Sequence, residues 1–147
     1  MMSDAKKISY FVYAAIIVAA AFMLWSIWNN TKAELLEVRG DTLFLQSSYV
    51  TEAFPIRLVD VENIRMIELT SDSPYRPVER IVGASTLTHG LYRLANGERA
   101  FVNRRGRGDL WLIPIHKRFD IIYRLKEPQT LIQQIRQSQA KQEPHKR

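Results

Sequence analysis

The sequence contains no cysteine, and this absence excludes disulfide bridges, thiolate metal sites and cysteine nucleophiles. It also lacks a nucleophile elbow, a P-loop and a glycine-rich dinucleotide loop around its serines and histidines. We therefore expect a protein that is not an enzyme and that has no cofactor. With 147 residues, the chain has room for one ordinary domain and an anchor.

One long apolar run is present, from Ile8 to Trp28. Its 21 residues carry no charge, and as a helix they extend about 31 Å, the thickness of a bilayer core. Tyr10 and Tyr13 lie near one end and Trp25 and Trp28 near the other, where aromatic rings favour the headgroup boundary. The run predicts a single transmembrane helix in contact with the lipid bilayer.

A cleaved signal peptide is the alternative interpretation of this segment. Lys6 and Lys7 form a positive n-region, and Ala19 to Ala21 supply small residues at a plausible cleavage point. The apolar run continues for seven residues beyond them, however, which favours an anchor that is retained.

Charges beside the apolar run bear on its orientation. Lys6 and Lys7 precede the run, whereas Lys32 and Arg39 follow it among acidic residues. The difference favours an N-terminus inside the cytoplasmic membrane and a domain outside it.

Short β-like segments separated by turn residues follow the anchor. Alternating apolar residues flank the turn Arg39–Asp41, which predicts a hairpin, and Asn96-Gly97 predicts a second hairpin between 91–94 and 99–102. Further candidate strands are 54–59, 64–69, 110–115 and 119–125, with a loop over 71–77. Pro114 predicts an edge or bulge position for 110–115, and alternation over 119–125 predicts one buried face. We expect an antiparallel sandwich or barrel.

A C-terminal helix is predicted after this β-rich region. Pro128 suits the first turn of a helix, and Leu131, Ile132 and Ile135 form an apolar stripe that can close a sheet. The expected organisation is an N-terminal tail (1–7), a transmembrane helix (8–28), a linker (29–33), a β domain with its helix (34–139) and a disordered tail (140–147).

Several of these segments resemble the bacterial pleckstrin-homology-like (PH-like) domain family. The likeness covers about residues 35–138 and is carried by Gly90–Leu94 leading into Asn96-Gly97, Leu110–Ile113, Tyr123–Leu125 and Glu127-Pro128 with the following helix. It implies a mainly β (α+β) fold, an antiparallel barrel or sandwich closed by one helix, in an adaptor or membrane-associated module. The turn Arg39–Asp41 lacks the basic cluster with which eukaryotic members bind phosphoinositides.

The densest basic stretch spans residues 99–118 and contains one acid, Asp109. Its cations are Arg99, Arg104, Arg105, Arg107, Lys117 and Arg118. If the hairpins bring them together, their guanidinium groups can hold phosphate or carboxylate groups of anionic lipids. A solvated cluster of turn residues is the alternative.

Other candidate sites are less developed. His89, His116 and His145 show no metal-ligand spacing, so we expect no metal site. We expect a non-enzymatic module of the bacterial cytoplasmic (inner) membrane that binds an envelope protein or itself, through a sheet edge or the groove beside the C-terminal helix. The alternative is an anionic-lipid sensor that uses the basic loops of 99–118. Neither nucleic acid nor a small-molecule substrate is expected.

Overall fold

The computed structural model describes residues 3–30 and 34–143, apart from the side chains of residues 29 and 30. The chain divides into two compact units, 1–33 and 34–147. The expected linker residues 31–33 and the outermost residues of both predicted tails, 1–2 and 144–147, lie outside the described residues.

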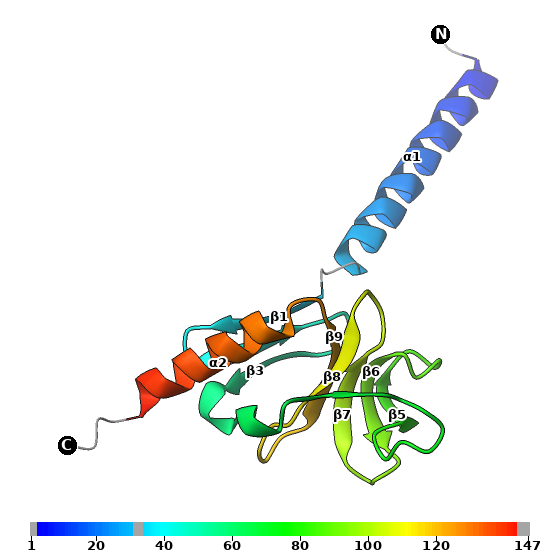
Figure 1. Ribbon diagram of the computed structural model, residues 1–147. Helices are drawn as coiled ribbons and strands as arrows, with labels where there is room; N and C mark the ends of the chain where they lie inside the picture. The colour runs from blue at the N-terminus through cyan, green and yellow to red at the C-terminus, as the bar shows by residue number, and fades with distance from the viewer. Residues whose placement is uncertain (1–2, 31–33, 144–147) are drawn as a thin grey trace. The chain divides into compact units, whose positions relative to one another are not determined.

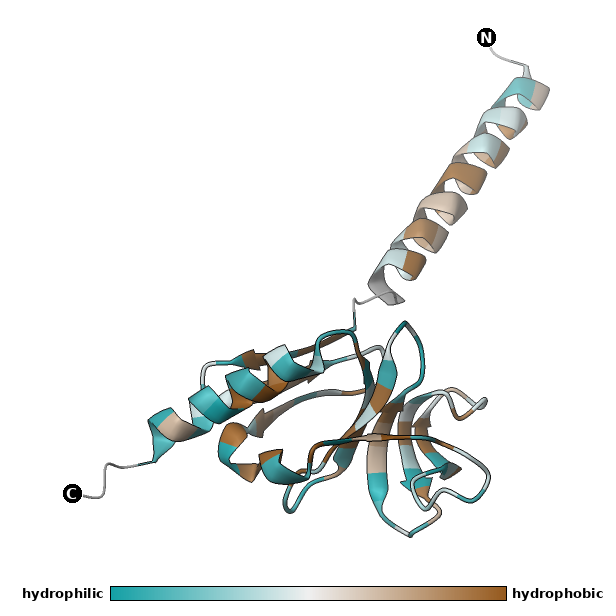
Figure 2. Cartoon of the chain, in the orientation of Figure 1, coloured by the Kyte–Doolittle hydropathy of each residue, from teal (hydrophilic) through white to brown (hydrophobic). Residues whose placement is uncertain are grey.

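Helix α1 (Asp4–Asn30) makes up the first unit (Figure 1). It is longer than the predicted span, since residues 4–7 and 29–30 are helical rather than tail and linker. Its apolar side chains are exposed along the whole helix, and Figure 2 shows the hydrophobic residues concentrated in its middle turns. In the described part of the chain α1 alone is long and apolar enough to cross a bilayer, a property that a retained anchor shares with a signal sequence.

A three-stranded antiparallel sheet begins the second unit. It consists of β1 (Leu35–Arg39), β2 (Thr42–Gln46) and β3 (Thr51–Pro55), in that order. Gly40 has a φ of +58° in the β1–β2 turn, and Val38 pairs with Leu43, which confirms the first predicted hairpin. The predicted strand 54–59 is wrong beyond Pro55, because 3₁₀ helix η1 (Ile56–Leu58) follows and a second, η2 (Val61–Asn63), comes soon after.

The second sheet has six strands. In spatial order they are β4 (Arg65–Ile67), β8 (Asp109–Ile113), β9 (Asp120–Leu125), β7 (Arg99–Asn103), β6 (His89–Leu94) and β5 (Pro77–Gly83). The β6–β7 hairpin is confirmed, with Gly97 at a φ of +86°. The expectation of purely antiparallel pairing is wrong, because β7 and β9 run parallel. Neither sheet of the described residues closes into a barrel, and the chain is α+β overall.

Two further strand predictions are corrected by the position of β8 and β9. Strand β8 lies between β4 and β9, so it is not an edge strand, and Pro114 lies beyond its end at Ile113. Strand β9 is buried on both faces rather than one, because Ile121 and Ile122 are both fully buried. The apolar side chains of this strand therefore pack into two separate clusters.

The six-stranded sheet separates two core clusters. The first includes Leu43, Leu45, Phe54, Phe101, Ile121 and Ile135, and the second includes Tyr92, Leu94, Val102, Leu112 and Ile122. Helix α2 (Pro128–Gln142), with Pro128 in its first turn, confirms the C-terminal helix, although residues 140–142 belong to it and not to a tail. Its Ser138 and Gln139 side chains donate to the backbone carbonyls of Gly40, Ile56 and Val59.

Candidate functional site

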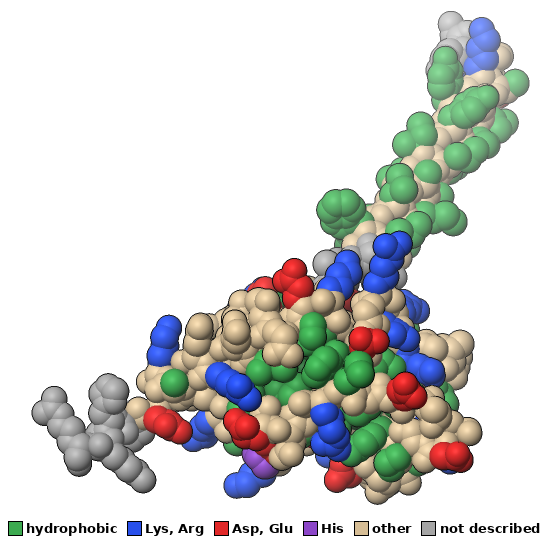
Figure 3. Space-filling model, viewed as in Figure 1, with side chains coloured by type: hydrophobic (Ala, Val, Ile, Leu, Met, Phe, Trp, Pro, Cys, Tyr) green, Lys and Arg blue, Asp and Glu red, His purple; other side chains and the backbone are tan. Residues whose placement is uncertain are grey.

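The six cations of residues 99–118 do not form one cluster. Arg99 begins β7, whereas Arg104, Arg105 and Arg107 follow its end. Because β7 and β9 are parallel, with Ala100 beside Asp120, the β8–β9 turn with Lys117 and Arg118 lies at the Arg99 end. Arg104 follows Arg99 by five positions, which corresponds to about 16 Å of extended strand. Cationic side chains are likewise scattered over the visible face of the domain in Figure 3.

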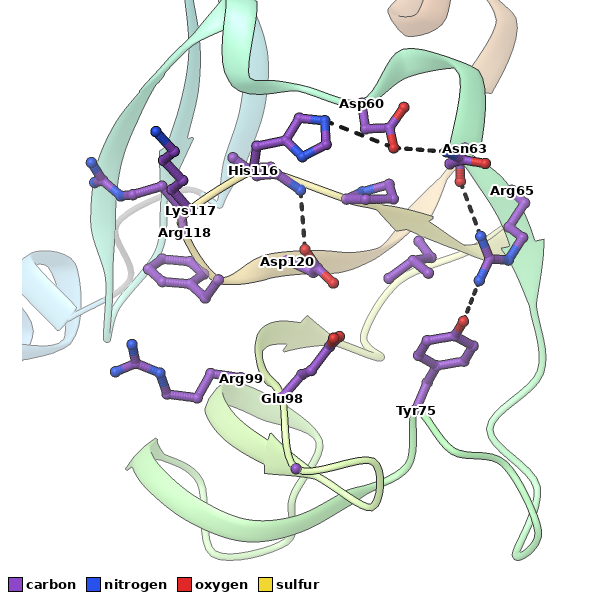
Figure 4. Close-up of a pocket in the computed structure, with 15 residues that line it drawn as sticks. Asp60, Asn63, Arg65, Tyr75, Glu98, Arg99, His116, Lys117, Arg118 and Asp120 are labelled. Carbon is purple, nitrogen blue, oxygen red and sulfur yellow. Dashed lines mark hydrogen bonds and ion pairs between the residues drawn. The ribbon is translucent and has the colours of Figure 1, made fainter.

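A polar groove of about 600 Å³ lies at the Arg99 end (Figure 4). It is lined by residues of the η2–β4 segment, the loop before β5, the β6–β7 turn and the β8–β9 turn, and its apolar lining includes Leu112 and Pro114. The charged residues that line it are Asp60, Arg65, Glu98, Arg99, Lys117, Arg118 and Asp120, together with His116. Cations and acids thus share one groove.

Asp120 is the most perturbed acid of this groove. It is half-buried, and its Oδ1 accepts a hydrogen bond from the Ile115 backbone N–H at 3.0 Å. Burial raises the pKa of the Asp120 carboxyl, against the opposing effect of that N–H, and the facing carboxylate of Glu98 raises it further. Figure 4 shows the two carboxyl groups on facing sides of the groove.

The other polar side chains of the groove are largely engaged with one another. Asn63 donates to Asp60 at 2.7 Å, Arg65 donates to the Tyr75 hydroxyl, and Arg118 forms an ion pair with Glu52 outside the groove. Arg99 and Lys117 form no ion pair with the described residues. An anion drawn to these two cations would also meet three acids, so this group is a poor site for anionic lipid.

The second group of cations lies on the β7–β8 loop, residues 104–108, which we call the arginine loop. Arg124 holds its backbone by donating to the carbonyls of Arg104 and Gly108, both at 2.7 Å. Gly108 has a φ of +101°, and a Cβ there would lie 2.5 Å from the Leu125 carbonyl oxygen, so only glycine fits. The loop therefore has a defined backbone.

The arginine side chains of the arginine loop are free, in contrast to its backbone, which Arg124 holds in place. Arg104, Arg105 and Arg107 are exposed, and in the described part of the chain none of them forms an ion pair. Asp109 is the one acid next to them in sequence. Three unpaired guanidinium groups on a fixed loop are suited to an anionic surface.

A buried histidine near the arginine loop was not identified from the sequence. His89 is 1% exposed, and its Nε2 lies against a carboxylate oxygen of Glu34. That contact lacks the alignment of a hydrogen bond, so neither ring nitrogen has a hydrogen-bond partner among the described residues. Asn103 donates to the other oxygen of Glu34, and Tyr49 and Phe101 pack edge-on against the imidazole.

The environment of His89 disfavours its charged form. Burial lowers the pKa of the His89 imidazole, the Glu34 carboxylate opposes that effect, and Arg105 adds to it. The pKa of the neighbouring Tyr123 phenol is raised, chiefly by burial and then by Glu34. His89 is thus a neutral core residue at pH 7, with no exposed face to offer a substrate.

Strand β5 has no counterpart among the predicted strands, because Pro77 favours a loop and no strand is predicted between residues 77 and 90. Strand β5 has β6 as its single neighbour among the described strands, which leaves its outer edge without a partner. Val78, Ile81 and Val82 are between 40% and 47% exposed. The available signal is the set of three β-branched residues among residues 78–82, namely Val78, Ile81 and Val82.

Metal binding has no support in the described residues, where no three His, Asp or Glu side chains form a group suited to an ion. His145 lies outside them. No protein-family model matches the chain, and neither the curated proteins nor the solved structures gave a match.

Proposed function

We propose that this chain is a single-pass, membrane-anchored, non-enzymatic module of the bacterial inner membrane that binds a protein partner through strand β5. The exposed edge of β5 is the observation that carries the proposal. An unpaired strand edge offers backbone donors and acceptors to an added strand, and exposed apolar side chains add affinity and selectivity. All seven residues of β5 are exposed or half-buried, so the edge is accessible to a partner strand.

Helix α1 supplies the anchor in this proposal. It is uncharged from Ile8 to Trp28 and exposes large apolar side chains on every side, which water would penalise and lipid would not. The flanking lysines favour an N-terminus inside and a domain outside. A PH-like domain family remains part of the proposal, supported by the order of many strands followed by one helix, although the parallel β7–β9 pair departs from an antiparallel barrel.

Cross-linking from single introduced cysteines tests the protein partner, because the chain has none of its own. We expect a cysteine at Ile81 of the full-length protein to form specific adducts in native membranes. A cysteine at Met66, an exposed residue on the opposite edge strand β4, is the matched control. Adducts of the same kind and yield from both positions would refute a β5 interface.

A second candidate function, anionic-lipid sensing, is favoured by the arginine loop. Asn103, the residue before the loop, contacts Glu34, and Glu34 lies six residues after Trp28 in the sequence. An anchor in the bilayer raises the effective concentration of the arginine loop at the lipid surface, which favours weak contacts with anionic headgroups. Each cation near an anionic surface contributes about 1 kcal/mol.

Vesicle flotation of residues 34–147, which contain both core clusters, separates the two candidates. We expect anionic vesicles to carry the domain and neutral vesicles not to do so. Replacement of Arg104, Arg105 and Arg107 by Ala should abolish flotation, whereas replacement of Arg99 and Lys117 should not. Equal losses from both sets would mean that net charge, and not the arginine loop, binds the lipid.

A further inference from the structure

We infer that the polar groove of Figure 4 binds a short peptide by its two free ends. The terminal ammonium group of the peptide lies between Glu98 and Asp120. Its terminal carboxylate is bound by Arg99 and Lys117. This site goes beyond the proposed function, because none of the seven residues of β5 lines the groove.

The groove has the size and the lining of a ligand site. Its volume of about 600 Å³ lies within the range of about 300–1,000 Å³ that is usual for ligand pockets. Apolar and aromatic residues lie among its charged ones, namely Leu112, Pro114, Tyr75 and Phe119. A single amino acid would leave much of this space unfilled, whereas the side chains of a short peptide can contact these residues.

Two acids of the groove have no cation of their own. Glu98 is exposed, and neither Glu98 nor Asp120 forms an ion pair with the described residues. Burial raises the pKa of the Asp120 carboxyl, and the carboxylate of Glu98 raises it further. A cation between the two carboxyl groups would oppose both effects, so this part of the groove is suited to an ammonium group.

Two cations of the groove likewise have no acid of their own. Arg99 and Lys117 are exposed and form no ion pair with any described residue. Figure 4 draws both at the left of the groove, with Glu98 and Asp120 to their right. An anion alone would meet the acids and a cation alone would meet the bases. A molecule with one charge of each sign complements both parts of the groove.

The spacing of these charges along the chain suits the two ends of a short peptide. Glu98 and Arg99 are consecutive, so their Cα atoms lie about 3.8 Å apart. Lys117 and Asp120 are three positions apart, which allows at most about 11 Å. An extended peptide spans about 3.5 Å per residue, so about two to four residues cover this range of distances.

Equilibrium dialysis of labelled alanine peptides against the full-length protein in nanodiscs tests the inference. The probes are the peptides of two, three and four alanines, and at least one of them should be retained above the level of empty nanodiscs. N-acetylation removes the ammonium group and amidation removes the terminal carboxylate. Each modification should weaken binding about fivefold, the effect of one lost ion pair at an exposed site.

Variants of the groove assign each end of the peptide to its contacts. Glu98→Gln should weaken binding of the unmodified peptide about fivefold and reduce the effect of N-acetylation, because both changes break the same contact. Lys117→Gly should likewise reduce the effect of amidation. Lys117 has a φ of +61°, a conformation that glycine adopts readily, so this variant removes the cation without straining the turn.

Two charge changes outside the groove are the matched controls. Glu68→Gln removes an exposed acid and Lys126→Gln removes an exposed cation, and neither residue lines the groove. Both variants should bind the unmodified peptide as wild type does. Thermal unfolding of each variant shows whether the domain remains folded.

The possible outcomes separate specific binding from general charge effects. Losses confined to the groove variants, with N-acetylation linked to Glu98 and amidation linked to Lys117, support the inference. It is overturned if none of the three peptides binds, if neither modification weakens binding, or if the control variants lose as much as the groove variants. Cross-linking from Ile81 depends on none of these results, so the β5 proposal is tested separately.

Discussion

Strands β9 and β5 belong to the same sheet but have opposite surroundings. Strand β9 lies between β8 and β7, and its Ile121 and Ile122 are fully buried in different core clusters. Strand β5 has one neighbour among the described strands, and residues 78–82 are all exposed. The comparison teaches that the centre of this sheet carries the stability, whereas its β5 edge is free to carry recognition.

Truncation of an apolar side chain should change the free energy of unfolding far more at the centre of the sheet than at its edge. Phe101 on β7 is fully buried in the first core cluster, so Phe101→Ala should lower the free energy of unfolding by about 3–5 kcal/mol. Val78→Ala at the exposed edge should change it by about 0.5 kcal/mol or less. Chemical denaturation of residues 34–147 measures both.

The two variants together test whether the buried centre of the sheet contributes more to stability than its exposed β5 edge. A loss below about 1 kcal/mol for Phe101→Ala would mean that the first core cluster contributes little to stability. A loss of several kcal/mol for Val78→Ala would mean that β5 is covered by other parts of the chain in solution.

A smaller effect is expected where the edge joins the rest of the sheet. Gly90 on β6 faces Gly83 on β5, with a φ of +141°, and a Cβ at Gly90 would lie 2.3 Å from the Val82 carbonyl oxygen. Gly90→Ala should cost about 1–3 kcal/mol through backbone strain alone and should loosen β5 from β6. Hydrogen exchange of β5 amides, faster in the variant than in wild type, checks this result.

A glycine in open space provides the control for this variant. Gly97 also has a positive φ, but a Cβ there would meet no atom within 4 Å. Asparagine tolerates such a turn, so Gly97→Asn should leave the exchange of β5 amides unchanged. If Gly90→Ala also left the hydrogen exchange of the β5 amides unchanged, the backbones of β5 and β6 would have moved apart at Gly90 without weakening their pairing.

Local features of this fold could be predicted from the sequence. The two hairpins are specified by turns with glycine at positive φ, Gly40 and Gly97, and α2 by Pro128 and its apolar stripe. The strand order of the six-stranded sheet could not be predicted. The parallel pairing of β7 with β9, and the central place of β8, depend on contacts between distant segments that no local pattern encodes.

The candidate sites show the same limit. The sequence predicts one dense basic run, but β7 divides it into two groups. Arg99 lies at the beginning of this strand, whereas Arg104, Arg105 and Arg107 follow its end. The contact between Asn103 and Glu34 joins residues 69 positions apart and had no sequence signal. Strand β5 could have been identified from its β-branched residues, but Pro77 favoured a loop.

The smallest effect is expected from protonation of His89, the buried first residue of β6. Burial lowers the pKa of His89 in the folded protein, so below a pH of about 6.5 the unfolded chain binds more protons than the folded one. The free energy of unfolding should therefore fall as the pH drops below 6.5, by at most about 1.4 kcal/mol per pH unit for one group. It should level off once the pH is below the folded-state pKa.

Two variants isolate this contribution from that of other titrating groups. His89→Gln removes the titration, so the difference between wild type and His89→Gln should vary with pH in this window. Arg105 lowers the pKa of His89, so Arg105→Gln should raise the folded-state pKa of His89. The pH range over which His89 changes the stability should then become narrower at its lower limit. Denaturation curves between pH 5 and 8 measure both effects, and a difference that stays constant with pH would show that His89 titrates alike in the folded and unfolded chains.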